Sequence, residues 1–259
     1  MSDCIFLKNH NALPGDPSQS NLYLIKMKTN KNIANLAGIL FLIAAVAAII
    51  GALLYNPILH NPDYIIEGTA HETQVLWGAF FEIITAFAVI GTPIALFPIL
   101  KKYNQRMAIA TVSFRLLEAT MIIIGILSLL TIVTLNHAFS TEINPDPTSY
   151  RLVGKSLLAL HDWTFAFGPN IALGPSTFMT GYLLYKSKLV PRFISILGLV
   201  GGPFIFTCGI LVVFGVFLQV SLWGVLLAIP VFLYEMSLAV WLLVKGFRKS
   251  DSDAVTVMR

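Results

Sequence analysis

Charged residues are scarce in this sequence. Asp, Glu, Lys and Arg make up 12% of the 259 residues, whereas soluble domains carry about 25%. Hydrophobic residues make up 56%, and the mean hydropathy is +0.79. Many of them fall in runs of about twenty, long enough to cross about 30 Å of hydrocarbon. The composition excludes an ordinary soluble domain and predicts a multi-pass membrane protein whose first partner is the lipid bilayer.

Cysteine and the common catalytic motifs are also scarce or missing. Cys4 lies in a polar tail and Cys208 inside an apolar run, so no disulfide framework is expected. The sequence has no CxxC, Walker A, GxGxxG, HExxH or GxSxG motif. These absences predict no cofactor and no metal. The net charge of +4 reflects the loops around the spans, so no nucleic-acid partner is expected.

The apolar runs predict an all-α bundle of six membrane-spanning helices, because helices satisfy their backbone hydrogen bonds within the segment. Residues 32–247 would form this bundle, 1–31 a polar tail and 248–259 a short cytoplasmic tail. The tail 1–31 could be disordered, or Met27 could be the natural start and 1–26 an upstream extension. The predicted spans are Ile33–Tyr55, Thr73–Leu100, Met107–Leu135, Leu157–Tyr185, Phe193–Phe217 and Leu222–Lys245.

Basic residues gather in alternate connectors, which predicts the orientation. Most of the 17 lysines and arginines flank the first span's start, the second and fourth connectors, and the last span's end. The positive-inside rule then places both termini in the cytoplasm of an inner (plasma) membrane protein. An even number of spans requires the same arrangement. The groups are Lys26, Lys28, Lys31; Lys101, Lys102, Arg106; Lys186, Lys188, Arg192; Lys245, Arg248, Lys249.

Proline and glycine interrupt several spans. Proline removes a helix hydrogen bond and clashes with the carbonyl four residues earlier, so kinks are expected. The fourth span holds two Gly-Pro steps, Gly168-Pro169 and Gly174-Pro175. Such steps are common in membrane helices, but they also fit a broken helix that lines a binding site, as in many transporters.

Charged side chains inside the spans form the first candidate site. The stretch FRLLEATMIIIG, residues 114–125, holds Arg115 and Glu118 in an apolar helix. With Glu82 and Glu235, they fall in the middle third of a core about 30 Å thick. Four unpaired charges there would cost roughly 10–14 kcal/mol on insertion scales. The four side chains are therefore predicted to meet, with Arg115 contacting at least one glutamate.

The cluster has two interpretations. An Arg–Glu network could orient the helices and do no chemistry. Alternatively, three carboxylates against one guanidinium leave excess negative charge, which suits a proton relay or a cation-coupled site.

The stretch LHDWTFAFGPN supplies the second candidate, an outer-side polar site at His161 and Asp162. Adjacent residues point about 100° apart on a helix, so these two do not converge on one ligand. Residues 163–185 alone are long enough to span, which would leave the pair at the rim; burial is the alternative. A zinc site is disfavoured because no span offers a second histidine.

Ordered motifs along the chain carry a family resemblance. GTPIALFPILKKYN, FRLLEA, LLALHDWTF..GP, GYLLYKSKLVPR, LGLVGGP and YEMSLAVWLLVKGF run from about Ile33 to Phe247. Together they resemble the bacterial and archaeal membrane family known as domain of unknown function 4386. The resemblance implies a multi-span inner-membrane protein and no particular reaction. The family's polar motif positions correspond here to the five charged residues and one histidine of the two candidate sites, namely Glu82, Arg115, Glu118, His161, Asp162 and Glu235.

Three functions fit the sequence. The favoured one is the binding or transport of a small solute or ion through the charged cluster. An intramembrane enzyme, metal-assisted in one version, could instead act on a lipid or small substrate through His161 and Asp162. A structural or regulatory subunit without chemistry is the third. The sequence indicates neither a substrate nor an oligomeric state.

Overall fold

The computed structural model describes residues 17–61, 63–67 and 71–248, and these contain no strand. The prediction of an all-α protein is confirmed. The elements are α1 (Pro17–Leu54), α2 (Asn56–Leu59), α3 (Tyr64–Glu67), α4 (Glu72–Leu100), α5 (Gln105–Thr141), α6 (Pro147–Ala166), the π-helix η1 (Phe167–Ala172), α7 (Leu173–Ser187), α8 (Arg192–Val213) and α9 (Leu222–Val244).

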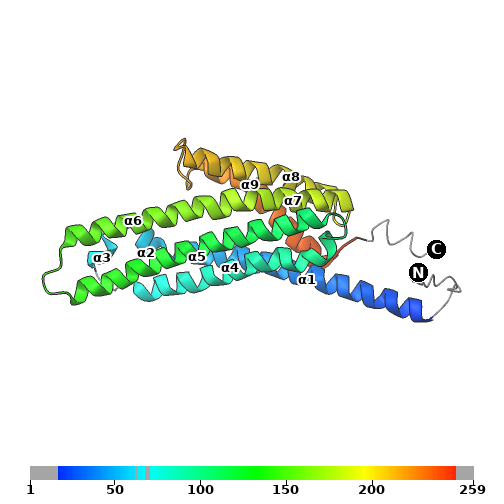
Figure 1. Ribbon diagram of the computed structural model, residues 1–259, viewed down its shortest axis with the longest axis horizontal. Coiled ribbons are helices and arrows are strands. Elements are labelled where there is room, and N and C mark those ends of the chain that lie inside the picture. Colours follow the sequence, from blue (N-terminus) through cyan, green and yellow to red (C-terminus); the bar gives the residue numbers. More distant parts are fainter. Residues whose placement is uncertain (1–16, 62, 68–70, 249–259) are drawn as a thin grey trace, which may run out of the picture.

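Five of the described helices are long and apolar enough to cross a membrane. They are α4, α5, α8, α9 and the part of α1 from Lys28 to Leu54. The chain is thus a membrane protein by composition and helix length, while the count of six spans stays a prediction. The segment predicted as the fourth span, Leu157–Tyr185, is divided among α6, η1 and α7, which follow one another beside α5 (Figure 1).

The first Gly-Pro step of that segment lies inside η1, so the helix widens to a π-helix there rather than unwinding. The second step, Gly174-Pro175, lies in the first turn of α7, which follows η1 directly. Both prolines are thus accommodated within a helical segment that runs from 147 to 187.

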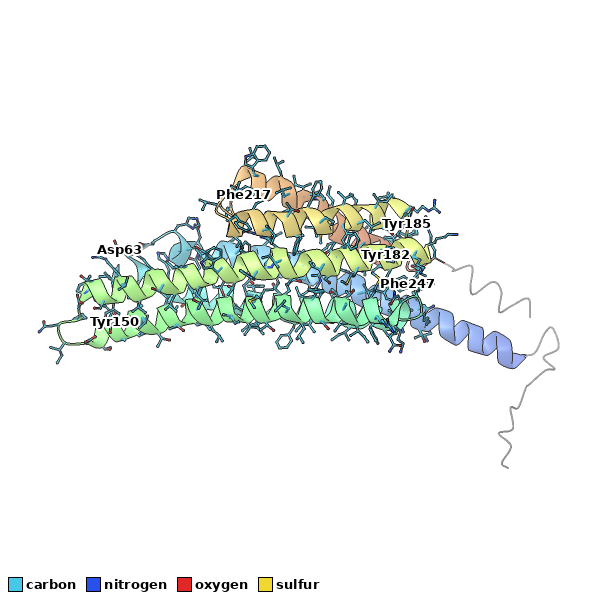
Figure 2. The ribbon with its side chains drawn as sticks, turned by 45° about the horizontal axis from the view of Figure 1, so that its top comes forward. Asp63, Tyr150, Tyr182, Tyr185, Phe217 and Phe247 are labelled. Atoms are coloured by element: carbon cyan, nitrogen blue, oxygen red, sulfur yellow. The ribbon has the colours of Figure 1, made fainter. Side chains whose placement is uncertain are left out.

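The α5–α6 pair is the longest part of the bundle. The 37 residues of α5 span about 55 Å, well beyond a hydrocarbon core of about 30 Å. Figure 2 shows Phe217, in the α8–α9 connection, lying well short of Asp63 and Tyr150 along the long axis. One end of the bundle therefore projects past α8 and α9. We call it the α2–α3 end, and the opposite end, where α4 meets α5 and α7 meets α8, the lysine-rich end.

Two apolar cores lie at different levels of the bundle. One, toward the lysine-rich end, joins α1, α4, α7 and α9 through Phe41, Leu96, Leu183 and Leu238. The other, toward the α2–α3 end, joins α2, α3, α4 and α5. Its members include Ile58, Ile65, Val75, Leu129 and Ile132. The charged cluster occupies the level between these cores.

Polar contacts organise the α2–α3 end. The buried amide of Asn136 donates to the carbonyl oxygens of Tyr64 and Ile65 at 2.9 and 3.0 Å, which fixes α3 on α5. Asp146 caps α6 by accepting from the backbone N–H groups of Thr148 and Ser149. Hydrogen bonds from the Ser149 hydroxyl and the Thr148 N–H hold the pKa of the Asp146 carboxyl below its usual value.

The predicted polar tail differs from the structure in part. Helix α1 begins at Pro17, so residues 17–31 are helical rather than irregular. A helix that continues past the hydrocarbon needs no apolar pattern, which explains why hydropathy alone ended the span near Ile33. Residues 1–16 and 249–259 lie outside the described residues, and the start at Met27 stays a prediction.

Candidate functional site

Arg115 and Glu118 lie three residues apart on α5, so both side chains point to the same face of the helix. That face is turned into the bundle, where Arg115 is 6% and Glu118 4% exposed. The Arg115 Nη1 atom lies 3.3 Å from Glu118 Oε2. No hydrogen bond to Glu118 Oε2 is formed from any described residue, so this ion pair is a loose one.

The second partner of Arg115 comes from α9. Its Nη2 atom donates to Glu235 Oε1 at 2.5 Å. Helix α9 packs mainly on α1 and α8, so this charged hydrogen bond links α9 to α5 across the interior. The contact predicted for Arg115 with a glutamate is present twice, once within α5 and once between helices.

A cavity of about 380 Å³ opens beside the guanidinium. It lies between α1 and α6, because α1 packs on α4 and α9 whereas α6 packs mainly on α3, α5 and η1. Its walls include apolar side chains of α1, notably Ala44, Ala48 and Ile49. All four residues of the predicted cluster and one of the outer pair line it, namely Glu82, Arg115, Glu118, His161 and Glu235.

Glu82 reaches the same cavity without joining the Arg115 network. It lies on α4 close to α1, since a Cβ placed on Gly51 would fall 2.8 Å from Glu82 Oε1. Its carboxylate makes no ion pair or hydrogen bond with any described residue. The cavity therefore carries three carboxylates against one guanidinium, and the unpaired one is separate from the other two.

His161 and Asp162 contact each other but differ in exposure, and His161 Nδ1 lies 3.3 Å from Asp162 Oδ1. The His161 side chain is 16% exposed and lines the cavity, whereas the Asp162 side chain is 75% exposed. The His161 ring packs edge-on to Tyr55 at 6.2 Å and stacks on Phe165 at 6.5 Å between ring centroids. His161 is the member of the pair that lines the cavity, and Asp162 does not. The exposed aspartate fits the rim, and the half-buried histidine fits the cavity wall.

Tyr55 is the cavity residue that the sequence analysis missed. It directly follows α1, is 3% exposed, and its hydroxyl is buried without a hydrogen-bond partner among the described residues. A tyrosine at the end of a span ordinarily belongs to the aromatic belt at the membrane surface. Its predicted place at the outer end of the first span lies about 13 Å above the predicted height of Glu82, so only the packing of α1 on α4 reveals that both line one cavity.

A second, smaller cavity lies on the other side of Arg115. Its volume is about 10 Å³, and threonines from three helices line it together with Tyr234. The hydroxyls of Thr177 and Tyr234 are buried and lack a partner among the described residues. A space of this size and polarity suits a single buried water. The described residues contain no group of three or more His, Cys, Asp and Glu placed to hold a metal ion.

Residues 36–246 match the protein family described as Domain of unknown function (DUF4386). The chain belongs to this family. The match confirms the resemblance expected from the ordered motifs, and it contains every residue of the cavity wall and the cluster. Comparison of this DUF4386 protein with curated proteins and with solved structures gives no match.

Proposed function

We propose that this DUF4386 protein crosses the plasma membrane six times, with both termini in the cytoplasm, and carries a small solute or ion through the cavity. The sixth crossing is the segment 147–187, formed by α6, η1 and α7. In Figure 1 the membrane part of α1 enters, and α9 ends, at the same end of the bundle. The connectors at that end carry most of the basic residues, in keeping with a cytoplasmic face.

Cysteine labelling tests this orientation. In a Cys4→Ser/Cys208→Ser background, Ile143→Cys should react from outside the cell with a membrane-impermeant maleimide. Ile143 is 90% exposed in the α5–α6 connection. Lys186→Cys, at an exposed position of the lysine-rich end, should react only after the membrane is opened. The reverse pattern would show that the topology is inverted. Labelling of both cysteines from one side would show that the segment between them does not cross the membrane.

The cavity is the observation that carries the proposed function. A network that only orients helices would be dry and fully paired, because each buried charge without a partner costs free energy. Here the charges border about 380 Å³ of space. Glu82 lacks a partner among the described residues, and Glu118 is held loosely. Intramembrane carboxylates with these properties are suited to binding a cation or exchanging a proton during transport.

Proteoliposomes test the transport. Vesicles containing the protein and a trapped pH dye would be challenged with small amines, carboxylates and neutral solutes. At least one solute class should change the internal pH faster than in empty vesicles. Glu118→Gln should slow this flux strongly, whereas Glu72→Gln, which lies on α4 outside the cavity, should not. An unchanged flux in every solute class, at verified protein incorporation, would refute the function.

One observation favours a purely structural role for part of the cluster. The Arg115–Glu235 hydrogen bond joins two helices that otherwise pack on different neighbours. A structural subunit would need that pair but no space beside Glu82. The enzyme alternative has less support, because Asp162 is not among the residues that line the cavity beside His161.

A further inference from the structure

The end of the cavity nearest α2 holds two polar groups without protein partners. The Tyr55 hydroxyl is buried and has no hydrogen-bond partner among the described residues. The Glu82 carboxylate forms neither an ion pair nor a hydrogen bond with them. Both lie beside the same stretch of α1, since Glu82 packs on Gly51, one turn before Tyr55. A buried hydroxyl without a partner costs free energy, so this arrangement is suited to a molecule that supplies the missing partner.

We propose that Glu82 and Tyr55 bind the ammonium group of a small organic cation whose apolar body lies along α1. This assignment rests on the proposed function, since it names the class of solute that the cavity takes. A protonated amine offers a positive charge to Glu82 and N–H donors to both Glu82 and the Tyr55 oxygen.

The aromatic rings at this end suit the same head group. Tyr55, His161 and Phe165 form a continuous set of ring contacts beside Glu82, and all three line the cavity. Ring faces attract organic cations, and the attraction strengthens as water is excluded. An anionic head group would be repelled by Glu82, and a neutral one could form a hydrogen bond there but would lack the attraction between opposite charges.

The remaining wall selects an organic cation over a metal ion. Ala45, Ala48, Ile49, Ile122 and Ile126 present hydrocarbon to the cavity. A hard metal cation needs about six or more oxygen ligands, and the described residues hold no group of three or more His, Cys, Asp or Glu placed for a metal ion. A hydrocarbon body, in contrast, is stabilised in proportion to the apolar area that it removes from water.

Arg115 limits the other end of the ligand site. Its guanidinium is already held by Glu118 and Glu235, so it offers no free charge to an anionic group. The space for the ligand's apolar body therefore runs from Tyr55 toward the Arg115 network, and the ammonium group lies at the Glu82 end.

Equilibrium binding of radiolabelled 2-phenylethylamine tests the proposal. The full chain would be placed in nanodiscs of phosphatidylcholine, with empty nanodiscs to correct for partition into lipid. The amine should bind saturably, and the neutral isostere 2-phenylethanol should compete at least about tenfold less well. Glu82→Gln should raise the Kd at least about tenfold, because it removes a charged hydrogen bond. Tyr55→Phe should raise it about two- to tenfold.

The matched control is Glu72→Gln, which changes a glutamate of the same helix that pairs with His137 outside the cavity. It should bind like the wild type. Equal competition by amine and alcohol, or an unchanged Kd in Glu82→Gln, would overturn the assignment. If Glu82→Gln does not fold, the amine-to-alcohol ratio of the wild type and the Tyr55→Phe value decide.

Two further comparisons distinguish a wrong ligand class from a wrong function, and a free amine from a lipid head group. If the wild type binds 2-phenylethanol or a carboxylate but not the amine, the ligand class is wrong while the proposed solute binding stands. If it binds none of these and transports nothing, both fail. Nanodiscs that also contain phosphatidylethanolamine distinguish the sources of the ammonium group. An unchanged Kd there assigns the site to a free amine, whereas competition assigns it to a lipid head group.

Discussion

Replacing Arg115 by methionine should lower the free energy of unfolding by about 3–5 kcal/mol, the typical cost of breaking a buried ion pair. The change leaves Glu118, which is 4% exposed, and Glu235 without their shared counter-charge. The double variant Arg115→Met/Glu235→Leu should recover part of the loss, because it removes one stranded carboxylate. Reversible unfolding in mixed micelles, followed by circular dichroism, measures both variants.

The geometry of the Arg115 network also predicts which of its two ion pairs has the larger coupling energy. Glu235 accepts a hydrogen bond at 2.5 Å, whereas Glu118 lies at 3.3 Å without hydrogen-bond geometry. The coupling energy of Arg115 in a double-mutant cycle should thus be larger with Glu235. Arg115→Lys should be damaging as well, because an ammonium cannot copy two separate Nη contacts.

The exposed arginine of the same helix supplies the control for these measurements. Arg106→Met, at the lysine-rich end of α5, should change stability by less than about 1 kcal/mol. An Arg115→Met variant as stable as Arg106→Met would show that the network does not support the fold. A double variant no more stable than the single one would show that Glu235 is not left stranded.

The apolar runs alone were enough to place most of the helices. Predicted boundaries such as Thr73–Leu100 and the observed Glu72–Leu100 agree closely, because hydrocarbon thickness sets helix length. Hydropathy says nothing about helix outside the hydrocarbon, so the extension of α5 to Thr141 was missed. The π-helix at Phe167–Ala172 was missed as well, since a Gly-Pro step permits either a kink or a widened turn.

The sequence predicts only those residues of the candidate site whose charge makes them costly inside a membrane span. A charge in a span needs a partner or water, and this argument selected Glu82, Arg115, Glu118 and Glu235. The cost of a charge in a span does not separate Glu82 from the Arg115 network, because depth along a helix does not fix the direction of a side chain. Tyr55 carries no charge, so its unpartnered hydroxyl became visible only once α1 was packed on α4.

The glycines of LGLVGGP support close helix contacts. Pro203 follows Gly201 and Gly202 inside α8, which is helical from Arg192 to Val213. A Cβ on Gly202 would lie 2.7 Å from both the Gly174 oxygen and the Phe178 nitrogen of α7. Both atoms belong to backbone, so neither can turn aside. Small residues allow such close approach of membrane helices.

Gly202→Ala should therefore lower the free energy of unfolding by at least about 1–3 kcal/mol, the usual cost of overpacking. Gly91→Ala is the matched control, because its Cβ would meet the end of the Leu40 side chain at 3.0 Å, which can rotate away. Thermal unfolding of the two variants in one detergent compares them directly. Since the clash separates α7 from α8 rather than touching the cavity, solute binding by folded Gly202→Ala should persist near the wild-type Kd. Equal melting temperatures for the two variants would mean that α7 and α8 do not approach as closely as the structure places them.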